Sequence, residues 1–435
     1  MLGLMNRVVS RTKEFCKTHN RFLRIMAAGL LLRLIVMPFF AHVDFLSEYA
    51  RVFRSISTGN VFAYSSRMVL SVIEIAWMTL CLPLLPDNGS IFLFADPAQS
   101  TAGLSDYFLF VSDPGIYRTL FLLKIPYLVF DLGTAAIIFH MMDGKARQWT
   151  ALKLWLFNPV TVYAFYLFGR YESIPLFFIA LTLLLLARQK ILWAALVFGV
   201  ALNCREIHIV YVPLLALSLV AYPLTFKQLG RTVIPAVLII AICYFLPLGI
   251  RHMTSVQPQL IGQLKNESDF GHALFGMRFN WLMPFIFSYA VICLWLIESR
   301  RDPFLKFTLS ACLVMISFLL TVAHSAHYVS WMLIFPIILL GSGRNTVKPL
   351  LLFCCAWILF WSFRTDAGVF TLFLASPLSM NFFGWRTLPQ VYSAQVGQGA
   401  LIDLNMLILI ARNIYGACLV YLGFNAIRRD RHVRA

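Results

Sequence analysis

The sequence predicts an all-α polytopic membrane protein with about twelve transmembrane helices. Of its 435 residues, 60% are hydrophobic and only 13% are charged, about half the charged fraction of an ordinary soluble domain. The mean hydropathy is +0.78. Apolar runs of roughly 17 to 22 residues recur along the chain, and each could cross about 30 Å of hydrocarbon as a helix. Because the backbone must satisfy its own hydrogen bonds in lipid, these runs are expected to be helical.

The predicted spans follow from these apolar runs. They are residues 25–41, 120–141, 152–168, 174–187, 191–203, 207–222, 233–250, 281–297, 307–323, 329–340, 350–363 and 404–424. Several middle runs are short, so we expect tilted or incompletely crossing helices there. The chain is treated as one integral membrane domain, with its bundle over residues 119–424.

The net charge is +17, and the distribution of the basic residues along the chain is better explained by membrane topology than by nucleic-acid binding. Lys and Arg gather in the terminal segments 1–24 and 425–435 and in short loops between spans, as the positive-inside rule describes. Both termini are therefore expected in the cytoplasm, and no nucleic-acid partner is expected. The basic loops assigned to the same side are 143–153, 188–190, 227–231, 298–306 and 344–348.

The segment between the first two spans, residues 42–118, is predicted to be a long extracytoplasmic loop with interfacial helices. Residues 68–85 are apolar enough to suggest a further span, but they contain Glu74 and are flanked by Arg67 and Asp87. Counting them would place the basic loop 143–153 outside, against the positive-inside rule. We assign them to a helix at the outer interface; whether they cross the membrane stays open.

The cysteines do not suggest a redox or metal framework. There are nine of them, with no Cys-x-x-Cys, and most lie inside apolar runs. They are interpreted as small core residues. The first apolar run lacks a small-residue cleavage site and is interpreted as a retained span.

Asp44 is the candidate catalytic residue. It follows the first span by a few residues and has His42 and Glu48 beside it. A carboxylate at the membrane surface can accept a proton from a hydroxyl group. The alternative is an ordinary loop aspartate next to a span.

Short turns on the outer side hold most of the remaining charges, and polar residues at membrane depth usually face a cavity or one another. Arg205 suits a phosphate because its guanidinium offers forked donors, although it could also reach lipid headgroups. The candidate substrate-binding and phosphate-binding residues are Glu48, Arg170, Glu172, Arg205, His208, His324, His327 and Tyr328.

His324 and His327 are three residues apart and would share a face if they lay on one helix. With His42 and Asp44 they could form a divalent metal site. The preferred interpretation is that they bond to a sugar or phosphate, without a metal cofactor.

Arg33 and Asp131 lie near the middles of the first two spans. Each would be costly in lipid if it were unpaired. We expect a buried structural ion pair that joins the two spans, ahead of a direct catalytic role.

Several short motifs resemble the polyprenyl-phosphate-sugar-dependent glycosyltransferases of the GT-C superfamily. These are the aspartate after the first span, LKIPYLVFD at 123–131, FNP at 157–159, GRYES at 169–173 and HYxxW at 327–331. The likeness is strongest to mannosyl- and glucosyltransferases that use dolichyl or undecaprenyl phosphate sugars, and it covers about residues 33–336.

This resemblance implies an inverting hexosyl transfer at the lumenal face of the endoplasmic reticulum or the periplasmic face of a bacterial inner membrane. The family's catalytic aspartate corresponds to Asp44, and its phosphate-binding basic residue to Arg205, where a lysine often stands. The implied partners are a polyprenyl-phosphate sugar donor, a glycan, lipid or protein acceptor, and membrane lipids. The sequence departs from the family at Tyr64-Ser65-Ser66, where a Tyr-Pro-Pro motif is common.

Two other functions stay open at the sequence level. Twelve spans with both ends inside also suit a secondary transporter, and residues 142–147 resemble a loop of the major facilitator family. The absence of a repeat between the two halves and the long first outer loop argue against it. A polysaccharide polymerase or ligase would also use polyprenyl lipids, but it is expected to have one dominant outer loop in its second half.

Overall fold

The computed structural model describes residues 20–60, 67–94, 104–142, 144–220, 229–254, 282–322, 324–364, 372–396 and 403–428, and every regular element in these ranges is helical. This confirms the predicted all-α class. After a first helix over residues 20–36 come α2 (Val43–Thr58), α3 (Met68–Cys81), η1 (Leu82–Leu84), η2 (Pro86–Phe94), α4 (Leu104–Val111), α5 (Ile116–Leu123) and α6 (Ile125–Met141). The middle of the chain forms α7 (Lys145–Leu156), α8 (Pro159–Val162), η3 (Tyr163–Leu167), α9 (Ser173–Ala187), α10 (Ile191–Cys204), η4 (Glu206–Tyr211), α11 (Val212–Ser218), η5 (Leu229–Val233) and α13 (Ile234–Thr254). The remainder forms α16 (Leu282–Glu298), α17 (Pro303–Thr321), η6 (Ala326–Val329), α18 (Ser330–Leu339), α19 (Val347–Phe363), η7 (Leu372–Ala375), η8 (Met380–Gly384), α20 (Leu388–Val396) and α21 (Leu404–Ile427).

Four helices in the described part of the chain are long and apolar enough to cross a membrane. They are Ile116–Met141, Leu229–Pro247, Pro303–Thr321 and Leu404–Ile427. Shorter apolar helices occur at most of the other predicted spans. The chain thus has the character of a membrane protein, whereas the number of about twelve crossings stays a prediction.

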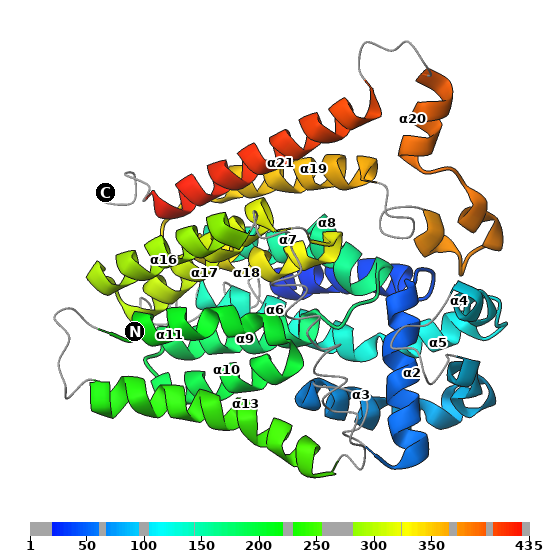
Figure 1. Ribbon diagram of the computed structural model, residues 1–435, viewed down its shortest axis with the longest axis horizontal. Coiled ribbons are helices and arrows are strands. Elements are labelled where there is room, and N and C mark those ends of the chain that lie inside the picture. Colours follow the sequence, from blue (N-terminus) through cyan, green and yellow to red (C-terminus); the bar gives the residue numbers. More distant parts are fainter. Residues whose placement is uncertain are drawn as a thin grey trace, which may run out of the picture.

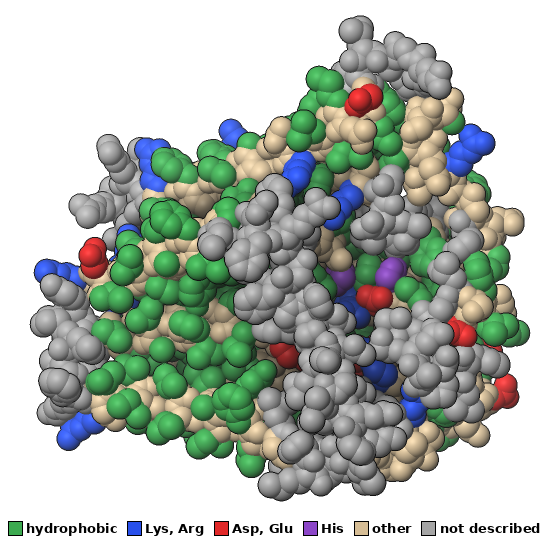
Figure 2. All heavy atoms as spheres, in the orientation of Figure 1, with side chains coloured by type: hydrophobic (Ala, Val, Ile, Leu, Met, Phe, Trp, Pro, Cys, Tyr) green, Lys and Arg blue, Asp and Glu red, His purple; other side chains and the backbone are tan. Residues whose placement is uncertain are grey.

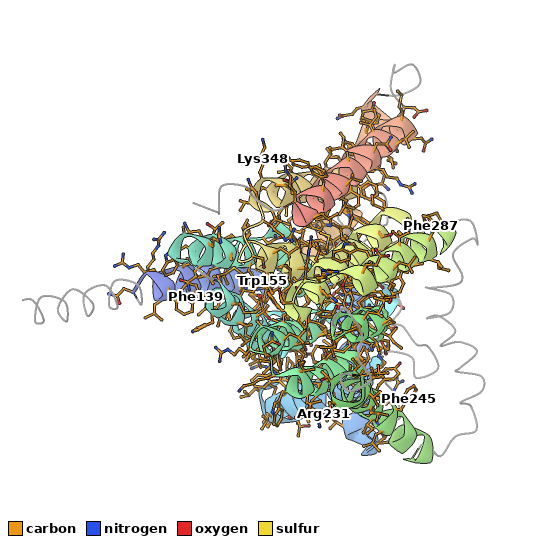
Figure 3. All side chains as sticks on the ribbon, turned by 90° about the vertical axis from the view of Figure 1, so that its left-hand side faces the viewer. Phe139, Trp155, Arg231, Phe245, Phe287 and Lys348 are labelled. Carbon is orange, nitrogen blue, oxygen red and sulfur yellow. The ribbon has the colours of Figure 1, made fainter. Side chains whose placement is uncertain are left out.

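Exposed apolar side chains show which surfaces suit lipid. Phe245 on α13 is 64% exposed and Phe287 on α16 is 73% exposed; both are labelled in Figure 3. In Figure 2 hydrophobic side chains cover much of the surface over these helices. Such an extended apolar surface would be unfavourable in water and is typical of a membrane-facing side.

A polar residue followed by a proline marks the start of two helices. The Asp302 carboxylate accepts from the Leu305 amide at 2.9 Å and is followed by Pro303, while Asn158 accepts from the Val160 amide at 2.9 Å and is followed by Pro159. These are favourable helix starts, since the side chain bonds a free backbone donor and proline needs none. The Asn158-Pro159 start also breaks the predicted span 152–168 into α7, α8 and η3.

One prediction on local structure was wrong. Residues 145–153, assigned to a basic loop, lie in α7. An apolar helix over Glu206–Ser218 occupies most of the span predicted over residues 207–222, and it changes from the short helix η4 to α11 at Val212. Charge and hydropathy report the position of a segment relative to the membrane, but they do not exclude helix in a charged segment or a change of helix type in an apolar one.

The helices lie side by side along one direction, and α2 runs across them near one end (Figure 1). α9 packs between α6 and α10, and α10 packs against α13. The approach of α10 to α13 is close because Gly199 has no side chain: a Cβ there would lie 2.4 Å from Cβ of Cys243. Successive helices run in opposite directions, so alternate turns lie at opposite ends of the bundle (Figure 1).

The predicted cytoplasmic turns after α9, α16 and α18 lie at the end of the bundle opposite to α2 (Figure 1). Figure 3 views that end and labels Arg231 of η5 and Lys348 of α19. The turns that carry the candidate site residues share the α2 end. The charge asymmetry thus corresponds to two distinct ends of the molecule, and which compartment each faces stays a prediction.

The helix α3 occupies most of the segment predicted to lie at the interface. It packs against α2, α6 and α10, and its Glu74 is fully buried, with Tyr127 donating a hydrogen bond at 3.1 Å. In Figure 1, α3 follows the direction of the bundle helices more closely than α2 does. The interfacial placement of residues 68–85 stays a prediction.

Reporter fusions test the topology. Because basic loops remain in the cytoplasm, fusions at Lys145, Leu229 or Arg301 are expected to report the cytoplasm and a fusion at Ser57 the other side. Cysteine accessibility to an impermeant reagent in sealed vesicles gives an independent measurement. Ser57 and Lys145 on the same side would show that α3 crosses the membrane.

The predicted pairing of Arg33 with Asp131 is present. Arg33 Nε and Asp131 Oδ2 are 2.5 Å apart, and both side chains are fully buried. Arg33 also donates to the carbonyl of Leu156 at 2.8 Å, while Trp155 Nε1 and the Tyr166 hydroxyl each donate to Asp131 at 2.7 Å. The pair therefore joins the first helix to α6, α7 and η3.

Candidate active site

Asp44 lies in the first turn of α2, just after the chain leaves the first helix. The His42 side chain caps α2 by accepting from the Asp44 amide at 3.1 Å. The corner is anchored from both sides, since the Ala41 amide donates to the Leu374 carbonyl at 3.0 Å and Tyr107 donates to the Ala41 carbonyl at 2.9 Å. The Asp44 side chain remains 33% exposed, so a substrate hydroxyl can reach it.

Lys124 fixes the end of the first helix beneath Asp44. Its fully buried ammonium group donates to the carbonyls of Met37, Phe40 and Tyr166. A cation at the carbonyl end of a helix is favourable, because those carbonyls have no partner within the helix. Lys124 was part of the quoted motif at 123–131, but its role required the tertiary structure.

The turn after η3 brings Arg170 to Asp44. η3 is a π-helix, a rare type that often occurs at functional sites, and it is followed by Gly169 with φ of +78°. A Cβ at Gly169 would lie 3.1 Å from the Phe45 ring of α2 and 3.3 Å from Cε of Lys124. Glycine is thus needed both for the left-handed backbone and for the close packing. The result is an ion pair of 3.4 Å between Arg170 Nη1 and Asp44 Oδ2.

Tyr171 is the centre around which the arginines gather. It is fully buried, and Arg67 and Arg205 both donate hydrogen bonds to its hydroxyl oxygen, Arg205 from Nη1 at 2.6 Å. The guanidinium carbon of Arg170 lies 5.0 Å from the centroid of the Tyr171 ring. One phenol thus positions three guanidinium groups within a small volume.

Carboxylates lie beside each of these arginines and offset their charge. Glu48 pairs with Arg51 at 2.7 Å and Arg67 at 3.2 Å, and Glu206 lies 3.9 Å from Arg67. Glu172 lies 3.5 Å from Arg205 and accepts from Trp331 Nε1 at 2.6 Å. We define the arginine cluster as Arg51, Arg67, Arg170 and Arg205. Figure 2 shows acidic, basic and histidine side chains gathered in the middle of one face of the molecule.

The His42 hydrogen bond and the arginine cluster hold the two carboxylates of α2 in their charged form. For Asp44, burial would raise the pKa, but the hydrogen bond with His42 and the charge of Arg170 outweigh it, so the pKa lies well below its usual range. For Glu48, burial is likewise outweighed by the charges of Arg51, Arg67 and Arg170, which lower the pKa. In the free protein, Asp44 is therefore an ionised but weak base.

A row of aromatic rings leads from Asp44 into the bundle. The His42 ring stacks on Phe168 at 3.9 Å, and Phe168 lies 4.4 Å from the His327 ring. The row continues through Tyr328 to Trp331, whose rings stack at 4.3 Å. The guanidinium of Arg205 lies over both, 5.5 Å from Tyr328 and 5.1 Å from Trp331, which is within the range of cation–π attraction. The ring of His208 follows, 6.4 Å from Trp331.

The structure brings most of the predicted site residues together. Asp44, Glu48, Arg170, Glu172, Arg205, His208, His327 and Tyr328 belong to the arginine cluster, its carboxylates or the row of rings. The Tyr64-Ser65-Ser66 segment lies outside the described residues.

The prediction that His324 and His327 share a helix face is wrong. Ser325 between them is extended, and the short helix η6 begins only at Ala326. His324 therefore points away from the site. Its Nε2 lies 3.2 Å from the Tyr415 hydroxyl oxygen of α21, and its Nδ1 lies 2.8 Å from the Val322 carbonyl oxygen. Within the described ranges, no group of three or more His, Cys, Asp or Glu side chains could hold a metal ion.

Sequence reasoning missed Arg51 and Arg67, and it gave Tyr171 and Trp331 no role of their own. Tyr171 and Trp331 belong to the motifs at 169–173 and 327–331, and this membership is the signal in the sequence that points to them. Arg67 was noted only as a charge flanking an apolar segment, because nothing in its neighbourhood along the chain indicates a partner more than a hundred residues away.

No protein-family model, curated protein or solved structure matches this chain. The functional argument therefore rests on the geometry of the site and on the motifs quoted above.

Proposed function

We propose that the protein is a GT-C-like inverting glycosyltransferase that moves a hexose, mannose or glucose, from a polyprenyl-phosphate donor to a lipid-linked glycan or another extracytoplasmic acceptor. The observation that carries the proposal is the pairing of a partly exposed Asp44 with Arg170 at the bundle end that holds the rest of the arginine cluster. A general base and a phosphate-binding surface thus lie side by side.

In the proposed reaction the acceptor hydroxyl oxygen forms a bond to the anomeric carbon of the donor sugar. Asp44 takes the hydroxyl proton, and the bond between the anomeric carbon and the phosphate oxygen breaks with its electron pair going to the phosphate. One displacement inverts the configuration. Polyprenyl phosphate is already a good leaving group, so the chain needs to supply positive charge to it and no general acid.

Arg170 gives the proposed mechanism an order of events. In the free protein its charge weakens Asp44 as a base. A donor phosphate competes for the same guanidinium group, and a carboxylate that loses its cationic partner becomes more basic. Donor binding is therefore expected to precede and activate proton removal from the acceptor.

Transfer assays test the function directly. The purified protein, reconstituted in lipid, would be given a panel of radiolabelled polyprenyl-phosphate hexoses together with lipid-linked glycan acceptors. We expect label to move to an acceptor, or slow hydrolysis of one donor when no acceptor fits. A folded protein that neither transfers nor hydrolyses any donor, but moves solutes across the vesicle membrane, would favour the transporter.

Arg205 is expected to bind the donor phosphate. Arg205→Ala removes a charge-assisted hydrogen bond and should raise the apparent donor KM roughly 10- to 100-fold, and Arg205→Lys should raise it less, because the charge is kept. Arg386→Ala is the matched control, since Arg386 is exposed and belongs to the segment before α20. An unchanged donor KM in a normally folded Arg205→Ala protein would contradict this role.

The pH dependence of kcat/KM tests the Arg170–Asp44 pair. Because Arg170 keeps the pKa of Asp44 below its usual range, protonation of Asp44 should not reduce kcat/KM of the wild type between pH 7 and about 5. In Arg170→Gln the hydrogen bond with His42 still lowers the pKa of Asp44, but the charge of Arg170 no longer does, so the pKa rises and the acidic fall of kcat/KM should begin at a higher pH than in the wild type. Parallel profiles for the two proteins would show that Arg170 does not control Asp44.

A further inference from the structure

Two buried histidines in the row of rings have ring nitrogens without protein partners. His327 and His208 are 2% and 1% exposed. Within the described part of the chain, neither Nδ1 nor Nε2 of either residue makes a hydrogen bond. Buried side-chain nitrogens are rarely left without any partner, so an arrangement of this kind points to a bound group.

His324 shows what a structural histidine looks like in the same region. It is 8% exposed, but both of its nitrogens lie within hydrogen-bonding distance of protein groups, the Tyr415 hydroxyl and the Val322 carbonyl. The fold can therefore satisfy a buried histidine where the role is packing. His327 and His208 differ from it although they lie in equally closed surroundings.

The charges around these two histidines determine which ligand chemistry suits them. Arg205 covers the Tyr328 and Trp331 rings that lie between them, and Arg170 is close to the Asp44 end of the row. Burial and the nearby cations both disfavour an imidazolium, and a neutral imidazole offers one donor and one acceptor. A hydroxyl group complements both, whereas an anion would go to the arginines.

The two histidines occupy different positions along the row. His327 lies beside Phe168, whose ring also stacks on His42, and so is near Asp44. His208 lies beyond Trp331 and stacks at 5.6 Å on Tyr211. The Tyr211 hydroxyl is buried as well, and it also has no hydrogen-bond partner among the described residues.

We infer that His327 and His208 bind hydroxyl groups of the sugar that is transferred, and that this sugar is an uncharged hexose. The inference rests on the proposed function and adds the residues that select the donor. His327 would bind the hydroxyl next to the anomeric carbon, because it adjoins the catalytic carboxylate. His208, with Tyr211, would bind a hydroxyl on the opposite side of the sugar ring.

Paired changes in protein and donor test this assignment. For the wild type, kcat/KM should fall roughly 10- to 100-fold from the parent hexose donor to its 2-deoxy or 4-deoxy analogue, since each loses a buried hydrogen bond. In His327→Phe the 2-deoxy penalty should disappear and the 4-deoxy penalty should remain. His208→Phe should show the reverse, and uronic-acid donors should be poor substrates of all three proteins.

His324→Phe is the matched control, because it removes a buried histidine three residues from His327 that already has protein partners. It should lower the thermal stability in detergent and leave both deoxy penalties unchanged. His327→Gln and His208→Gln keep donor and acceptor groups and should retain part of the penalty, and they carry the test if a phenylalanine variant does not fold.

Failure of the inference differs from failure of the function. Penalties that persist in full in both phenylalanine variants would refute the sugar contacts while the glycosyltransferase stands. A folded wild-type protein that uses no donor at all would overturn both.

Discussion

Asp44→Asn is expected to abolish detectable transfer while leaving expression and donor binding close to normal. The amide keeps the shape of the side chain and removes its ability to take a proton. A general base contributes on the order of 10² to 10⁴ in rate, and the variant is expected to lose that factor. Arg170 would lose its partner carboxylate in this variant, so donor binding could tighten slightly, because the phosphate no longer competes with Asp44.

The measurement compares turnover and donor affinity on one preparation of each variant. Asp87→Asn is the matched control, since Asp87 is an exposed acid in the same predicted loop and has a positive φ of 44°, a conformation that asparagine adopts readily. Wild-type turnover in a folded Asp44→Asn protein would exclude Asp44 as the general base and favour the secondary transporter.

Neutralising either member of the Arg33–Asp131 pair is expected to cost about 3 to 5 kcal/mol in the free energy of unfolding. Arg33→Gln leaves a carboxylate that is fully buried and still surrounded by the Trp155 and Tyr166 donors. Asp131→Asn leaves a buried guanidinium that bonds the Gly29 and Leu156 carbonyls and lies 5.6 Å from the centroid of the Tyr166 ring, with no carboxylate to offset its charge. The double variant should lose less than the sum of the two, because it leaves no uncompensated charge.

Unfolding in detergent would be followed for the wild type, both single variants and the double variant. Arg386→Gln is the control, since Arg386 is exposed and its replacement should change stability little. Additive losses would show that the two side chains do not interact energetically, in spite of their 2.5 Å separation.

The sequence by itself determined the all-α class, the position of most helices and the end of the molecule at which most of the candidate site residues gather. Long apolar runs must be helical because lipid offers no partners to the backbone, and the basic turns mark one end of the bundle. Charge also led to the Arg33–Asp131 pair, since two opposite charges in neighbouring spans have few other ways to be compensated.

Only the tertiary structure decided how the site is composed. Arg67, Tyr171 and Arg205 converge from three separate segments, and no local pattern encodes a contact between residues so far apart. The side chains of His324 and His327 point in different directions because the backbone at Ser325 is extended. Three-residue spacing in the sequence cannot reveal such a backbone conformation. Apolar periodicity reports burial along one helix, whereas a catalytic arrangement depends on turns, and in turns the direction of a side chain is set by the elements packed around it.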